Sequence, residues 1–197
     1  MSDFIICLAG LFASVAPFGA LGTVLRYKRD IARQQSPDAL QLDRLTLFSP
    51  VAAFVLVAIA ALVSDPLLDA LRISGPSFEF AAAAAMLPLA IRLLVFGDSM
   101  TPPAWKLPDL AWLMPFALPL LAGPVSLIAA ISYADRFGVA EAIVAAAIPL
   151  SLTGTLFATL PRWQRARPLV VQMLGRLSGV LLVAMAAEMV LDGLYSV

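Results

Sequence analysis

The sequence has no histidine and only one cysteine, Cys7, among its 197 residues. Histidine is the usual general base near neutral pH and the commonest ligand of transition metals. A single cysteine cannot form a disulfide within the chain or a cysteine-based zinc site. The spans also lack paired aspartates, a serine elbow and a glycine-rich phosphate loop. We therefore predict that the protein is not an enzyme, and we expect no catalytic residue, no metal and no cofactor.

Charged residues are scarce as well, at 13% of the chain, whereas apolar residues make up 61%. An ordinary soluble domain has roughly 25% charged residues, so this chain has too few polar side chains to cover a soluble globule. Its mean hydropathy of +0.94 agrees with this. Basic and acidic residues number 13 each, so no excess of positive charge indicates nucleic acid binding. We predict a single transmembrane domain over residues 1–197.

Six apolar segments are long enough to cross a bilayer, since a spanning helix needs about 20 residues. None has the strict alternation of a strand in an outer-membrane barrel. The predicted fold is therefore an all-α integral membrane protein with six transmembrane helices. The predicted spans are Phe4–Leu25, Leu45–Val63, Pro76–Phe96, Leu110–Ser132, Val139–Leu160 and Val170–Leu194.

The basic residues predict the orientation of these spans. Ten of them fall on one side of the membrane, against only Arg72 and Arg136 on the other. By the positive-inside rule the side with ten is cytoplasmic. We therefore expect a multi-pass protein of the bacterial inner membrane with both termini outside. The ten residues are Arg26, Lys28, Arg29, Arg33, Arg44, Lys106, Arg162, Arg165, Arg167 and Arg176.

The two halves of the chain resemble each other weakly. Ala90 and Gly97 at the end of the third span match Ala186 and Gly193 at the end of the sixth. Because each half contains three spans, the second half must be inverted relative to the first. Inverted repeats with a site at the repeat interface near the midplane are typical of secondary transporters. We predict an inverted 3+3 repeat.

Pro17 and Pro124 each lie close to glycine in the middle of a span, in spans one and four. Proline removes a backbone donor and frees a carbonyl, and such groups need partners inside a membrane. We predict that both spans are broken here; a simple kink is the alternative. The amides and carbonyls of broken helices can bind a zwitterion without any charged side chain. The predicted substrate-binding residues are Ser14, Ala16, Pro17, Phe18, Gly19, Ala122, Gly123, Pro124, Val125 and Ser126.

Three segments carry a resemblance to a known family. They are Ala-Pro-Phe-Gly-Ala-Leu at 16–21, Pro-Leu-Leu-Ala-Gly-Pro at 119–124, and the last span from Leu-Gly-Arg-Leu-Ser-Gly at 174–179 to Leu-Asp-Gly at 191–193. In their order and spacing they resemble the MarC family of six-span bacterial inner-membrane proteins. The family includes small neutral amino acid transporters, so the resemblance implies such transport. The chain departs from the family at Ala16, where asparagine is usual, and at Val125, where glycine is usual.

The leading prediction is a secondary transporter of small neutral amino acids such as glycine, alanine or serine. Its partners are a small zwitterionic substrate and the lipid bilayer, and the coupling ion is a proton or sodium held by freed carbonyls. The alternatives are an amino acid exporter of the LysE type and a membrane protein without transport activity, in envelope structure or stress response. The small-residue pair Gly175 and Gly179 indicates either packing within the monomer or the surface of a homodimer.

Overall fold

The computed structural model describes residues 2–34, 39–96, 121–159 and 168–195, and these residues form only helices and the turns between them. The chain begins with α1 and α2, which follow each other almost without interruption. The helices are α1 (Ser2–Val15), α2 (Pro17–Gln34), α3 (Ala39–Leu62), α4 (Ser64–Leu71), α5 (Gly75–Phe96), α6 (Pro124–Phe137), α7 (Val139–Ala158) and α9 (Pro168–Tyr195).

Four stretches of helix are long and apolar enough to cross a membrane. They are Asp3–Leu25, Gly75–Phe96, Val139–Ala158 and Gln172–Tyr195, and they confirm the predicted first, third, fifth and sixth spans. The second predicted span lies in α3. It qualifies only as Phe48–Leu62 together with Ser64–Leu71, a pair that is bent by 52°. The structure thus supports four spans, or five if the bent pair is one span, within the residues it describes.

The fourth predicted span, Leu110–Ser132, is only partly within the described residues, because residues 110–120 lie outside them. Its described part is mostly α6, which has 14 residues. A helix of that length spans about 21 Å at 1.5 Å per residue, less than the roughly 30 Å of a bilayer core. The fourth span, the total of six spans and the inverted repeat therefore stay predictions.

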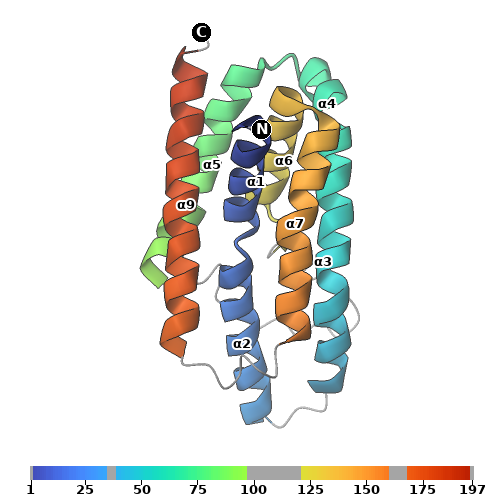
Figure 1. The fold of residues 1–197 in the computed structure, drawn as a ribbon, viewed down its shortest axis with the longest axis vertical. Helices are drawn as coiled ribbons and strands as arrows, with labels where there is room; N and C mark the ends of the chain where they lie inside the picture. Colours follow the sequence, from blue (N-terminus) through green and yellow to red (C-terminus); the bar gives the residue numbers. More distant parts are fainter. Residues whose placement is uncertain (1, 35–38, 97–120, 160–167, 196–197) are drawn as a thin grey trace.

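The helices form an elongated bundle, with both ends of the chain at the same end (Figure 1). Helix α5 packs along α9, and α3 packs along α7. Helices α1 and α2 are stacked end to end between these pairs (Figure 1), and α6 packs against α1, α3, α5 and α7. The outer faces carry large exposed apolar side chains, such as Ile59, Val144 and Leu177. Such faces suit contact with lipid, since a soluble protein rarely exposes so much apolar surface.

Gly179 lets α9 approach the backbone of α5 closely. A Cβ atom at this position would lie 2.6 Å from the backbone nitrogen of Leu94 and 2.9 Å from the carbonyl carbon of Leu93. Gly175, one turn earlier, is also buried. Helices in lipid gain contact area when small residues bring their backbones together. Gly179 therefore serves packing within the monomer, one of the two interpretations that the sequence left open.

Candidate functional site

The first span is interrupted at a single residue. Helix α1 ends at Val15 and α2 begins at Pro17, and Ala16 between them has a positive φ of 46°. Its N–H still donates to the Phe12 carbonyl at 3.1 Å, and its carbonyl accepts from the N–H of Ala20 at 3.0 Å. We expected a departure from regular helix over residues 16–20, but helix resumes at Pro17 because the proline φ suits a first turn.

The break leaves backbone groups without their helical partners. Pro17 has no N–H, so it cannot donate to the carbonyl of Ala13. The positive φ at Ala16 is one that glycine and asparagine adopt more readily than alanine. Asparagine is the residue that the family resemblance leads one to expect at this position. The positive φ at the break thus explains why asparagine would suit this position. Alanine adopts the same φ only with strain.

Polar side chains near this break are directed to backbone carbonyls. The buried Ser14 hydroxyl donates to the Leu11 carbonyl at 3.0 Å. The Thr23 hydroxyl donates to the carbonyl of Gly19 at 3.1 Å. Thr23 was not among the residues predicted from the sequence, although its place one turn after Gly19 is the signal that could have found it. The ring of Phe18 contacts that of Phe12 edge to face, with centroids 6.2 Å apart, and covers this side of the break.

The second half of the candidate site is the start of α6. Gly123 is extended, with φ −74° and ψ 171°, and Pro124 occupies the first turn. The Ser126 hydroxyl donates to the Leu121 carbonyl at 2.7 Å and to the Gly123 carbonyl at 3.0 Å. In this first turn the N–H groups of Val125 and Ser126 have no acceptor within the helix. They lie at the positive end of the helix dipole, an arrangement that suits an anionic group.

The two halves of the candidate site lie in the same part of the interior. Helix α1 packs against α6, and in Figure 1 the lower end of α6 is at about the level of the break between α1 and α2. Ala16, Ala122 and Val125 are all buried in the apolar core that runs through the bundle. The buried polar side chains closest in sequence to the two interruptions are Ser14, Thr23 and Ser126, and all three carry hydroxyls. The site therefore combines neutral hydroxyls with backbone groups.

The structure places all ten predicted residues at or beside the two interruptions. Ser14 lies in the last turn of α1, Ala16 at the break, and Pro17, Phe18 and Gly19 in the first turn of α2. Ala122 and Gly123 directly precede α6, and Pro124, Val125 and Ser126 begin it. Pro124 is the one exposed residue of this second group. That these residues bind a substrate stays a prediction.

Comparison with known proteins decides the family. The model of the family described as "MarC family integral membrane protein" matches the chain over residues 1–197. The chain belongs to the MarC family. It is also similar to a UPF0056 membrane protein of Methanocaldococcus jannaschii, with 26% identity over 204 aligned residues that cover 97% of this chain and 95% of that protein. No solved structure matches this MarC protein significantly.

Proposed function

We propose that this MarC protein is a secondary transporter of small neutral amino acids, which bind between the break at Ala16 and the start of α6. The observation that carries the proposal is the pair of interruptions, which come from different halves of the chain and lie in one buried region without a charged side chain. Broken helices that meet near the midplane are how many secondary transporters bind substrates.

The packing of the helices supports an inverted repeat. Helix α1 packs on α6, α3 on α7 and α5 on α9, so spans that correspond in the two halves contact each other. A pseudo-twofold axis in the membrane plane would pair them in this way. Both chain ends at one end of the bundle (Figure 1) also suit an even number of spans. Combined with the basic residues, this supports termini on the outer side of the bacterial inner membrane.

The groups available at the site favour a zwitterion. The free N–H groups of Val125 and Ser126 suit a carboxylate, and the freed carbonyl of Ala13 near the negative end of α1 suits an ammonium group. A substrate with a net charge would lack a counter-charge among these groups, and burying an unpaired charge is costly. Phe18 and Val125 beside the interruptions limit the space, which favours glycine, alanine or serine. Freed carbonyls would also hold the coupling proton or sodium ion.

Transport of labelled alanine into proteoliposomes tests this function. We expect uptake by the wild type, and a fall of at least roughly tenfold in Gly19→Val and Gly123→Val, the change that about 1.4 kcal/mol of lost binding produces. Gly154→Val is the matched control, because this glycine lies inside α7 and the atoms nearest to a Cβ there, at 3.8 Å, belong to Pro50 and to neither interruption.

The outcomes separate the site from the function. Flux that survives in both site variants would exclude the proposed site. If folded wild-type protein transports no neutral amino acid, the non-transporting alternative is favoured. A thermal-shift screen of the purified protein against the standard amino acids gives an independent reading, since a ligand at 100 times its dissociation constant adds about 2.7 kcal/mol of stability.

A further inference from the structure

A charged cluster joins three helices at the end of the bundle where the chain termini lie. Arg136, in the last turn of α6, forms an ion pair and hydrogen bond with Asp192 of α9. Its Nη1 atom is also 3.9 Å from Oε1 of Glu79 in α5. The side chains of Arg136, Asp192 and Glu79 are 35%, 31% and 12% exposed, so all three are partly withdrawn from water. We call these three residues the charged cluster.

Arg136 is the one cation in this cluster, and more carboxylates surround it. Glu188 is close to Arg136, and Asp135 is close enough to Glu79 to act on its charge. Burial lowers the pKa of Arg136, but the hydrogen bond to Asp192 and the neighbouring carboxylates raise it further, so the guanidinium stays charged. Without this cation, Asp192 and Glu79 would face each other as like charges. The cluster therefore binds α6 to α5 and α9 only as long as Arg136 is in place.

Tyr133 fills the space between α1 and α6 one turn below the cluster. Its side chain is 2% exposed, and its ring stacks on that of Phe137 with centroids 6.0 Å apart. A Cβ atom at Gly10 of α1 would lie 1.9 Å from the Tyr133 hydroxyl oxygen, so the ring occupies a notch that only glycine leaves open. The hydroxyl has no hydrogen-bond partner in the described part of the chain.

The contact between α1 and α6 leads from the charged cluster to the candidate substrate site. On α6, Tyr133 and Ser126 are seven residues apart and share one face of the helix. On α1, Gly10 and Ser14 are four residues apart and likewise share one face of their helix. The same face of α6 that carries Tyr133 therefore ends at the Ser126 hydroxyl, beside the interruption.

We propose that the charged cluster and Tyr133 form the gate that closes the substrate site toward the end of the bundle where the termini lie. This inference rests on the proposed transport function and adds its closing device. Opening separates Arg136 from its partners and moves Tyr133 out of the notch at Gly10. The ion pairs stabilise the closed state, whereas the buried hydroxyl without a partner destabilises it, because water can bind the hydroxyl once the gate opens. Opposing contributions of this kind keep two states close in free energy.

Cys7 is a native reporter for this gate. It is the only cysteine in the chain, it lies one turn before Gly10 on α1, and it is 0% exposed. A water-soluble maleimide should therefore label the reconstituted full-length wild type slowly. We expect Arg136→Gln to be labelled roughly tenfold faster, the change that a loss of about 1.4 kcal/mol from the closed state produces.

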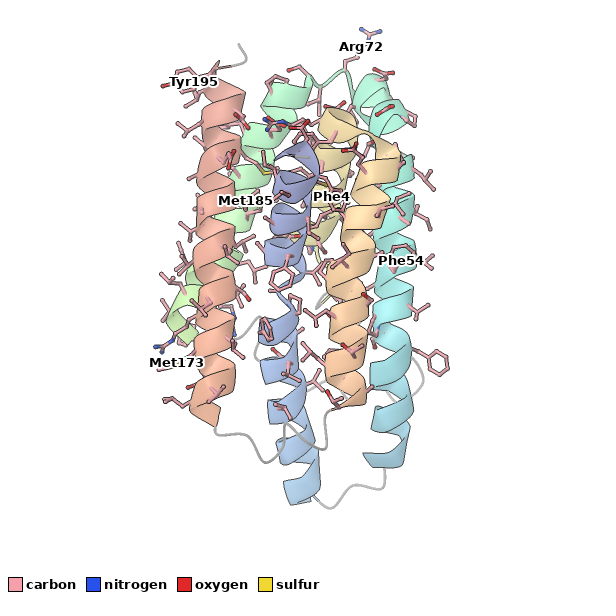
Figure 2. The ribbon with its side chains drawn as sticks, in the orientation of Figure 1. Phe4, Phe54, Arg72, Met173, Met185 and Tyr195 are labelled. Atoms are coloured by element: carbon pink, nitrogen blue, oxygen red, sulfur yellow. The ribbon has the colours of Figure 1, made fainter. Side chains whose placement is uncertain are left out.

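Three further variants make the test specific. Arg72→Gln is the matched control, because Arg72 is exposed at the same end and points away from the bundle (Figure 2); its labelling should stay at the wild-type rate. Arg136→Lys should keep labelling slow, because it retains a cation beside Asp192 and Glu79. Tyr133→Phe removes the hydroxyl that has no partner, so it should be labelled more slowly than the wild type.

The results distinguish this gate from the transport function, since labelling requires no substrate. Equal labelling of Arg136→Gln and wild type would overturn the gate, as would an equal increase in Arg72→Gln. Faster labelling of Arg136→Gln without alanine flux in any protein would support the gate and overturn the amino acid substrate. If Arg136→Gln does not fold, Tyr133→Phe decides: labelling of Cys7 in folded Tyr133→Phe as fast as in the wild type, or faster, overturns the proposal.

Discussion

Replacing Gly179 by alanine is expected to loosen the packing of α9 on α5. The new Cβ would lie 2.6 Å from the backbone nitrogen of Leu94, 2.9 Å from the carbonyl carbon of Leu93 and 3.0 Å from its Cβ. Two of these three atoms belong to the backbone, so no change of rotamer relieves the contact. Ordinary contact begins near 3.4 Å, and α9 must therefore move away from α5 by about 0.8 Å at this point.

The expected cost follows from two opposing contributions. Overpacking a well-packed interior costs about 1–3 kcal/mol, and alanine returns up to about 1 kcal/mol because it favours helix over glycine. The net result is a loss of about 1–2 kcal/mol in the free energy of unfolding. Gly154→Ala is the matched control, since its Cβ would lie 3.8 Å from Pro50 in ordinary contact. It should therefore gain up to about 1 kcal/mol from helix propensity alone.

Thermal unfolding of the detergent-solubilised protein, followed by circular dichroism in one detergent, measures both variants against the wild type. Gly179→Ala should lower the midpoint and Gly154→Ala should raise it. The opposite signs are the important result, because the two substitutions are chemically identical and both fall inside long apolar helices. A Gly179→Ala protein as stable as the wild type would refute the close approach of α9 and α5 as the reason for this glycine.

Two further predictions concern strain and pH. Ala16→Gly should raise the thermal midpoint by an amount equivalent to up to about 1 kcal/mol, because glycine adopts a positive φ without the penalty that alanine bears; a lower midpoint would contradict the strained break. Burial, with the nearby charges of Asp65 and Asp69, raises the pKa of Asp135 in the folded protein. Protonated Asp135 therefore stabilises the fold. This stabilisation is complete below the ordinary pKa of about 3.9 and is lost as pH rises through the raised pKa. Asp135→Asn should thus be more stable than the wild type at about pH 7, by no more than about 0.5 kcal/mol, and midpoints at low pH should show no such advantage.

The membrane class and most of the spans follow from the sequence because hydropathy is a local property. A run of about 20 apolar residues needs a bilayer whatever surrounds it, and four predicted spans contain helices of that kind. The break in the first span was also predictable, because proline acts on its own turn and on the turn before it. The sequence did not predict that the break covers Ala16 alone, since proline at the first position of a helix permits the helix to resume at once.

The bend between α3 and α4 shows where local reasoning stops. Pro66 stands three residues after Val63, where the bend of 52° occurs, and it has no N–H to donate to the carbonyl of Leu62. Pro50 and Pro88, by contrast, lie inside α3 and α5, each of which is one continuous helix. Whether a helix continues through a proline or bends at it depends on what its neighbours allow at that level, and tertiary packing restores the lost contacts.

The charged cluster and the Tyr133 notch were decided by the tertiary structure alone. In the sequence, Arg136 stands out only as one of two basic residues on the side predicted to be outer, and neither Tyr133 nor Gly10 carries a signal of a role. Arg136 and Asp192 are 56 positions apart, and no periodicity within either helix records that they meet. Hydropathy and proline act within a turn or a span, whereas pairing between helices depends on how each helix is rotated and at what height it packs. For this protein the sequence determined which segments are apolar enough to enter a membrane and that the first one breaks near Pro17, and the packing of those segments determined which side chains meet at the end of the bundle where the termini lie.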